Sequence, residues 1–168
     1  MDTDRLKQML KITQCSKETT VLACDQLPSG GSRKPAPNTA FIVNLQESWR
    51  PGNHWIVLYV VNENIVELFD SLVTNSDVNN KYIRKFVSQF HILKKNSGAR
   101  LQDTLSETCG LYCVYFIFFR CKKEITIYQI IDELFSDDTL MNECRVVAFT
   151  NEVFQKQLFQ HIRHGCVT

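Results

Sequence analysis

Cys109 lies in a sequence context that favours a nucleophilic cysteine. It lies between the polar stretch 106–108 and a hydrophobic run that extends to Cys121. If that run is a helix, its N-terminus supplies roughly half a positive charge and unpaired N–H groups. Both favour a thiolate and lower the pKa of the cysteine. Gly110 follows the thiol and, having no side chain, lets a substrate backbone approach closely.

A histidine and an aspartate mark the ends of two strand-like runs. His54 begins one β-branched and aromatic run and Asp70 ends the next, with an Asn-Glu-Asn turn at 62–64 between them. Opposed residues of an antiparallel hairpin have a constant index sum. If Tyr59 faces Ile65, that sum is 124. His54 then faces Asp70, whereas a two-residue turn places the two on opposite faces, and the sequence leaves both registers open.

Cysteine, histidine and aspartate together form the nucleophile, base and orienting group of acyl-transfer catalysis. Such catalysis also needs hydrogen-bond donors for the oxyanion of the tetrahedral intermediate. The backbone N–H of Cys109 is one candidate donor. The side-chain amide of Gln102, seven residues earlier, is the other. The residues therefore predict a cysteine hydrolase, provided that the fold brings them together.

The hydropathy pattern indicates how the chain could position these residues. The run from Cys109 is apolar almost all round, which predicts a buried central helix, although its β-branched and aromatic content leaves a buried strand open. We expect an α+β fold in one catalytic domain over 1–168. Its sheet should be mixed but mainly antiparallel and should pack on that central helix, with helices on both sides. The expected helices are 4–12, 78–90, 109–121, 125–135 and 151–161; the expected strands are 39–45, 54–61 and 65–70; and 28–38 and 94–100 are expected loops.

The composition is that of an ordinary globular protein. Of 168 residues, 44% are hydrophobic and 22% charged, and the net charge is +1, which excludes a disordered chain and a polybasic DNA coat protein. The start of the chain resembles no signal peptide, and the longest apolar run is too short to span a membrane. The seven cysteines are therefore expected to be reduced.

Several motifs together resemble those of the adenain-like cysteine proteases. They are His54-Trp55, Leu68-Phe69-Asp70, Gln102 and Cys109-Gly110-Leu111-Tyr112. This family comprises the adenovirus endopeptidase and its relatives in Maverick/Polinton-type elements and adintoviruses. Its clan includes the SUMO- and NEDD8-deconjugating proteases. The resemblance spans roughly residues 40–120, and its His, Asp, Gln, Cys order differs from papain-type enzymes, which place the cysteine first.

The resemblance implies a role for each matched residue. Cys109 corresponds to the nucleophile and His54 to the general base, while Asp70 orients the imidazole. Gln102, with the backbone of Cys109, corresponds to the oxyanion hole. Trp55 corresponds to an aromatic wall of the site, so it and Gly110 are expected to contact substrate. The fold implied is the adenain/Ulp1-like cysteine protease fold.

The same motifs leave the branch of the clan open. The step of seven residues from Gln102 to Cys109 is that of the adenovirus enzymes, whereas the SUMO proteases typically use six. In contrast, Phe69-Asp70-Ser71-Leu72 resembles the deconjugase motif. The favoured function is a viral or transposon-encoded endopeptidase that cleaves capsid or core precursors during virion maturation, beside glycine or other small residues. The alternatives are a ubiquitin-like-modifier deconjugase that acts on host proteins and an inactive binding module of the same fold.

We expect neither a metal nor a required cofactor. The adenovirus enzymes are activated by DNA and by a peptide tethered to a cysteine upstream of the glutamine, but residues 91–101 contain no cysteine. A peptide activator would therefore be held non-covalently. Weak DNA binding would depend on a small patch formed by Lys94-Lys95, Arg100 and Lys122-Lys123. The expected partners are precursor polyproteins, with no membrane. We expect a monomer in the virion and in the host nucleus or cytoplasm that is not secreted.

Overall fold

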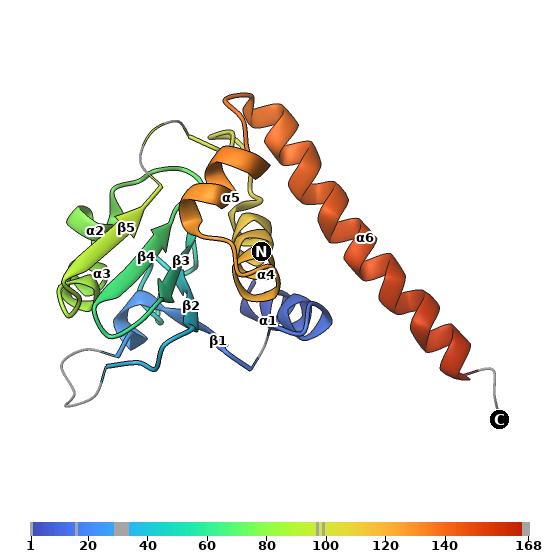
Figure 1. The fold of residues 1–168 in the computed structure, drawn as a ribbon, viewed down its shortest axis with the longest axis horizontal. Coiled ribbons are helices and arrows are strands. Elements are labelled where there is room, and N and C mark those ends of the chain that lie inside the picture. Colours follow the sequence, from blue (N-terminus) through green and yellow to red (C-terminus); the bar gives the residue numbers. More distant parts are fainter. Residues whose placement is uncertain (1, 16, 29–33, 97, 99, 166–168) are drawn as a thin grey trace.

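The computed structural model describes residues 2–15, 17–28, 34–96, 98 and 100–165, with the backbone alone at 154 and 156–165. Five strands form one sheet in the order β1-β2-β3-β4-β5, and helices lie on both of its faces (Figure 1). The helices are α1 (Thr3–Ile12), α2 (Ser76–Asn79), α3 (Lys81–Val87), α4 (Cys109–Lys122), α5 (Ile127–Leu134) and α6 (Thr139–Gly165). The strands are β1 (Thr19–Ala23), β2 (Thr39–Asn44), β3 (Trp55–Val60), β4 (Ile65–Phe69) and β5 (Ile92–Lys95), and one 3₁₀ turn, η1, covers Cys24–Gln26.

The sheet has two antiparallel and two parallel strand pairings, so the expectation of a mainly antiparallel sheet was wrong. The two inner pairings, β2 with β3 and β3 with β4, are antiparallel. The two outer pairings, β1 with β2 and β4 with β5, are parallel. The difference arises because the hydropathy pattern indicates only the three inner strands. The short edge strands β1 and β5 lack a clear alternating pattern, and 92–95 contains two lysines.

Both faces of the sheet are covered, which explains the unbroken apolar runs of β2 and β3. Alternate residues such as Ile42 and Val57 pack against α1, α4 and α5, while Phe41 and Leu58 pack on the other face against α3. Every residue of β3 is buried. A strand that is buried on both sides reads as a continuous hydrophobic segment rather than an alternating one. The sheet is therefore a rigid platform for the residues at its ends.

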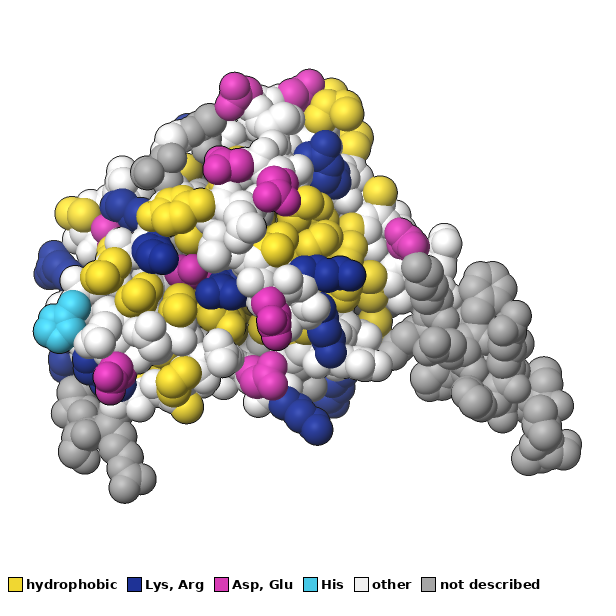
Figure 2. Space-filling model, in the orientation of Figure 1, with side chains coloured by type: hydrophobic (Ala, Val, Ile, Leu, Met, Phe, Trp, Pro, Cys, Tyr) yellow, Lys and Arg dark blue, Asp and Glu magenta, His cyan; other side chains and the backbone are white. Residues whose placement is uncertain are grey.

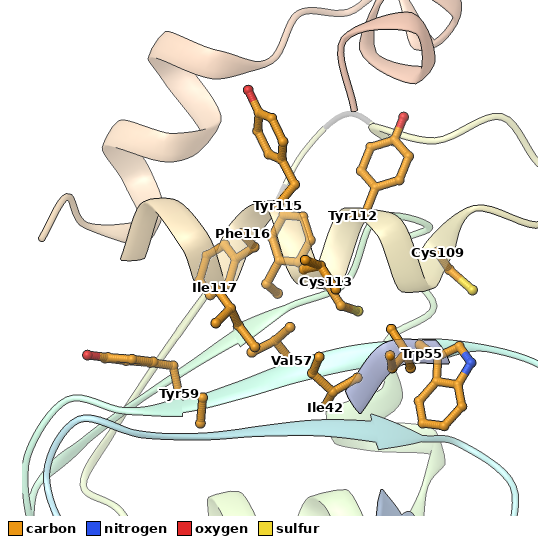
Figure 3. Packing of buried hydrophobic residues seen from close by; sticks show 14 of the residues in the cluster. Ile42, Trp55, Val57, Tyr59, Cys109, Tyr112, Cys113, Tyr115, Phe116 and Ile117 are labelled. Carbon is orange, nitrogen blue, oxygen red and sulfur yellow. The ribbon is translucent and has the colours of Figure 1, made fainter. Parts of the chain in front are cut away.

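The central element is the helix α4, as expected, and not the alternative strand. The element spans 14 residues, which is too long for a typical strand. Its first turn closes on the carbonyl oxygen of Thr108, which accepts from the N–H groups of Leu111 and Tyr112. Cys113 and Ile117 face β2 and β3, whereas Tyr112 points to the opposite side (Figure 3). Cys113 is therefore a core residue.

The β3–β4 hairpin has a different register from the one predicted. Tyr59 pairs with Glu67 rather than with Ile65, so the index sum is 126 instead of 124. The side chain of Asn62 causes the shift because its Oδ1 accepts from the N–H groups of Asn64 and Ile65 and closes a three-residue loop. An even shift leaves every side chain on its predicted face. The residues before β3 and after β4 therefore still meet on one side of the sheet.

Two predicted helices have different limits in the structure. The helix expected over 78–90 is divided into α2 and α3 at Asn80, whose extended backbone and side-chain bonds to the N–H groups of Tyr82 and Ile83 make it an N-cap. The helix expected over 151–161 is the later part of α6. That helix already begins at Thr139, after Asp138 has capped the N–H groups of two residues in its first turn.

The surface carries charges of both signs, interspersed with apolar side chains on the face shown in Figure 2. This distribution matches the net charge of +1. Within the described ranges, no helix is both long enough and apolar enough to cross a bilayer.

Candidate active site

His54 and Asp70 form a buried, hydrogen-bonded pair at one end of the inner strands. His54 immediately precedes β3 and Asp70 immediately follows β4, and Nε2 of the imidazole lies 2.7 Å from Oδ1 of the carboxylate. Their side chains are only 7% and 3% exposed. The contact predicted from the hairpin is therefore present, although the register that produces it differs. In the observed register, His54 and Asp70 are diagonal neighbours on the two strands and not directly opposed residues.

The carboxylate of Asp70 is fixed by a tight turn that follows it. Oδ1 also accepts from the N–H of Leu72 at 3.0 Å. Oδ2 accepts from the N–H and the hydroxyl of Thr74 at 2.8 and 2.6 Å. Asn96 holds the backbone of Asp70 from the other side, since its amide accepts from the Asp70 N–H and donates to the Asp70 carbonyl oxygen, both at 2.8 Å. Asp70 therefore has little freedom to leave the imidazole.

Cys109 is the first residue of α4 and lies beside His54. Burial is the strongest single influence on the pKa of Cys109 and raises it, whereas the imidazole of His54 lowers it. Backbone N–H groups of Trp55 and Gly110 also stabilise the thiolate, so the pKa of Cys109 is below its ordinary value. The start of β3 and the start of α4 thus supply the electropositive surroundings that a reactive cysteine requires.

The imidazole of His54 is correspondingly stabilised in its charged form. Burial lowers the pKa of His54, but the hydrogen bond to Asp70 and the interaction with Cys109 outweigh burial and raise that pKa to about 9. The pKa of Asp70 is lowered: burial raises it, but the bond to His54, the charge of His54 and the bonds from Thr74 together outweigh burial. These shifts favour the charged form of each group: a carboxylate, an imidazolium and a thiolate. The second ring nitrogen of His54, Nδ1, is buried and forms no hydrogen bond within the described residues.

Gln102 is completely buried and held in one orientation by Ser71, the residue after Asp70. The Ser71 hydroxyl donates to Oε1 of Gln102 at 2.7 Å, and the Ser71 carbonyl oxygen accepts from the Gln102 N–H at 3.1 Å. Oε1 is therefore the acceptor, and Nε2 lies on the other side of the amide. Nε2 donates to the carbonyl oxygen of Ser106 at 2.8 Å and has one more hydrogen. Ser71 thus links the orienting carboxylate to the predicted oxyanion donor.

Trp55 connects the site to an open surface cleft. It is itself 6% exposed, and it lines a cleft of about 670 Å³ that lies between the start of α1, the end of β1 and the segment before β3. Of the predicted site residues, Trp55 is the one that borders this cleft. Figure 3 shows its indole on the sheet below Cys109. Gly110 lies in the first turn of α4, directly after the thiol.

Comparisons with known proteins give limited information about this chain. No protein-family model matches the sequence, and no curated protein matches it. Among solved structures, the selenomethionine form of ASFV pS273R protease aligns with a TM-score of 0.39 and 21% sequence identity. The alignment covers 64% of this chain but only 43% of that protease. The functional assignment therefore depends on the geometry of the site.

The structure brings His54, Asp70 and Cys109 together, and Gln102 is connected to them through Ser71, the residue after Asp70. Three supporting residues were not identified as functional from the sequence: Ser71, Thr74 and Asn96. Ser71 belongs to the Phe-Asp-Ser-Leu motif, which offered a signal. Asn96 is 26 residues from Asp70 and is brought to it by β5, a strand that the hydropathy pattern did not indicate.

Proposed function

We propose that this protein is a cysteine endopeptidase in which His54, Asp70 and Cys109 form the catalytic triad. The observation that carries the proposal is the buried 2.7 Å contact between His54 and Asp70 beside a helix N-terminal thiol. Burial opposes charge on each of these groups, so a lowered thiol pKa and a raised imidazole pKa mark an arrangement in which the charges support one another. Perturbed groups of this kind occur preferentially at active sites.

The first half-reaction would form an acyl-enzyme. The Cys109 thiolate attacks the scissile carbonyl carbon, a C–S bond forms, and the carbonyl electrons move onto oxygen. The backbone N–H of Cys109 and the second amide hydrogen of Gln102 would stabilise that oxyanion. The imidazolium of His54 then donates its Nδ1 proton to the leaving nitrogen, and the C–N bond breaks. Asp70 keeps Nε2 protonated throughout, which fixes Nδ1 as the nitrogen that exchanges protons with sulfur and substrate.

The second half-reaction would release the acyl group. Neutral His54 accepts a proton from water at Nδ1, and the resulting hydroxide equivalent attacks the thioester carbon. Collapse of the second tetrahedral intermediate breaks the C–S bond, restores the imidazolium-thiolate pair and frees a carboxylic acid, which loses its proton to solvent. The same donors serve both intermediates because the oxyanion forms at the same place.

The substrates proposed are structural precursor proteins of a virus or a mobile element, cleaved beside glycine or another small residue. This part rests on the resemblance of the motifs to the adenain-like proteases. The test is incubation of the purified protein with a capsid precursor and a proteome-derived peptide library, followed by mass spectrometry of the new termini. We expect cleavage by the wild-type protein and none by Cys109→Ala. Cleavage by Cys109→Ala at the same sites would overturn the proposal.

A second candidate is a deconjugase of ubiquitin-like modifiers. It is favoured by the resemblance of Phe69-Asp70-Ser71-Leu72 to the deconjugase motif, and in this chain the hydroxyl of Ser71 binds Gln102. Vinyl-sulfone probes of ubiquitin, SUMO and NEDD8 separate the two candidates. Labelling of Cys109 by one modifier, without cleavage of precursors, would assign the protein to this second class. An inactive binding module would give neither cleavage nor labelling.

The proposed enzyme acts as a monomer, needs no metal or tethered peptide, and works in the virion and in the infected cell. DNA binding through the lysine pairs and Arg100 stays a separate prediction. Lys95 of that patch forms an ion pair with Asp77 at 2.8 Å, so part of the positive charge is already neutralised. Loss of nucleic-acid binding on replacing both Lys122 and Lys123 would identify the remaining patch as the contact surface.

A further inference from the structure

The beginning of α6 reaches into the loop that joins Gln102 to Cys109. Glu143, in the second turn of this helix, places Oε1 2.6 Å from the hydroxyl of Ser106. The same oxygen accepts from the hydroxyl of Thr108, and Oε2 lies 3.3 Å from the hydroxyl of Tyr112. One half-buried carboxylate thus binds three side chains that flank the candidate nucleophile. Neither the motifs nor the proposed mechanism accounts for this arrangement.

Two of these three partners belong to the catalytic geometry itself. Ser106 supplies the carbonyl oxygen that receives Nε2 of Gln102, so its position determines where the amide points. Thr108 is the N-cap of α4, and its carbonyl oxygen accepts the N–H bonds of the first turn after Cys109. Glu143 therefore holds the partner of the oxyanion donor and the start of the nucleophile's helix with a single oxygen atom.

The neighbouring residue of α6 fixes the other end of the same loop. Asn142 is completely buried and donates to the carbonyl oxygen of Leu101, the residue before Gln102, at 3.1 Å. The hydroxyl of Tyr112 lies 3.1 Å from that same carbonyl oxygen. Burial and the nearby carboxylate of Glu143 raise the pKa of Tyr112, so its phenol stays protonated and remains a donor. The loop is thus anchored from α6 at both ends.

We propose that Glu143 is a positioning residue that sets the geometry of the oxyanion hole by fixing Ser106 against Gln102 and Thr108 at the start of α4. The inference rests on the proposed endopeptidase function and extends it to α6, an element to which that function assigns no role. Glu143 need not touch the substrate. It acts through the hydrogen bonds that hold Ser106 and Thr108, and displacements of about 1 Å at a catalytic site can cost on the order of 10²-fold in rate.

The experiment compares two reactions of Cys109 that differ in their need for an oxyanion hole. Peptide hydrolysis requires oxyanion stabilisation, whereas alkylation by iodoacetamide requires only an accessible thiolate activated by His54. Glu143→Ala removes the carboxylate oxygen that accepts from both hydroxyls and leaves these hydroxyls, 2.6 Å apart, only each other among the partners named above. Glu143→Gln retains a carbonyl oxygen that can take the place of Oε1. Glu107→Ala is the matched control because Glu107 is exposed and lies in the same loop.

We expect Glu143→Ala to lower kcat for peptide hydrolysis by about 10- to 100-fold. KM should change by less than about twofold, and the alkylation rate and its pH profile should stay those of the wild type. Glu143→Gln should recover activity to within about threefold of the wild type, and Glu107→Ala should behave like the wild type.

Three results would overturn the inference. The first is wild-type kcat in Glu143→Ala, and the second is a parallel loss of hydrolysis and alkylation, which would indicate a general structural role. The third is an equal loss in Glu143→Gln, which would assign the effect to charge rather than to hydrogen-bond geometry. If the wild-type protein is alkylated normally but cleaves no peptide, the proposed endopeptidase function is wrong. The inference about Glu143 is then wrong as well, because it rests on that function.

Discussion

Asp70→Asn should lower the pKa of His54 more than any other single substitution that leaves the ring in place. Asn is nearly isosteric with Asp, but it cannot satisfy all the donors that surround this side chain. His54, Leu72 and Thr74 together direct four donor groups at the two carboxylate oxygens. An amide offers one acceptor oxygen, so its NH₂ must face either Thr74 or the imidazole.

The size of the effect follows from the shift of His54. Its pKa is about 9 instead of the ordinary 6.5, a difference of about 2.5 units or roughly 3 kcal/mol. The hydrogen bond to Asp70 is the strongest influence that raises this pKa, and burial opposes it. Without the carboxylate, the pKa of His54 should fall to its ordinary value or below. The imidazolium-thiolate pair would then be largely neutral at pH 7, and kcat/KM should fall by on the order of 10²-fold.

NMR titration of the histidine side chains measures this change directly. The chain has four histidines, and the signal of His54 is identified by its loss in His54→Ala. Because the thiol and the imidazole titrate as a coupled pair, the titration should also be recorded in a Cys109→Ala background. Asp132→Asn, an exposed change on α5, is the matched control. An unchanged His54 titration in Asp70→Asn would refute the reasoning, whatever the effect on activity.

Four further substitutions and conditions test other parts of the structure. Gln102→Ala should lower kcat by about 10²- to 10³-fold without altering alkylation of Cys109; equal losses in both assays would exclude an oxyanion role. Phe116→Ala should lower the free energy of unfolding by about 3–5 kcal/mol in chemical denaturation. The reason is that Phe116 is completely buried and stacks on Phe69 with ring centroids 4.5 Å apart. A decrease of less than about 1 kcal/mol would contradict this packing. Asn80→Ala should lower the free energy of unfolding by about 1 kcal/mol, because Asn80 is a helix cap that binds two N–H groups. An unchanged free energy of unfolding would argue against the break between α2 and α3. The pKa of Asp70 is lowered in the folded state, so its contribution to stability is complete above about pH 4 and is lost as the pH falls through that lowered value. The acid unfolding curves of the wild type and of Asp70→Asn should therefore converge at low pH. Parallel curves would contradict the lowered pKa.

Features encoded locally could be predicted from the sequence. The helix that begins at Cys109 has a long apolar run, and β3 and β4 have dense β-branched content on either side of an Asn-Glu-Asn turn. The predicted register was wrong by two residues, but His54 and Asp70 still lie on the same face. The face of a strand residue changes only when the register shifts by an odd number of residues. Even an inexact alignment of the hairpin could therefore bring these two residues together.

Features that depend on distant parts of the chain could not be predicted in this way. β5 contains two lysines and is a strand because it pairs with β4, and through that pairing Asn96 reaches Asp70. Glu143 is 35 residues from Thr108 and meets it because α6 packs beside α4. No local pattern specifies such contacts, since they arise from tertiary packing. The short-range pattern thus identified the reacting groups, while most of the residues that hold them in place emerged only from the fold.

The central claim is that His54 activates the thiol of Cys109. The most direct measurement is the rate of iodoacetamide alkylation of Cys109 against pH, with the adduct mapped by mass spectrometry, in the wild type and in His54→Ala. We predict that the wild type has its midpoint below pH 8.5, the ordinary midpoint of a free cysteine, and that His54→Ala moves the midpoint to that value or above. A wild-type midpoint at or above pH 8.5 that does not move in His54→Ala would contradict the account.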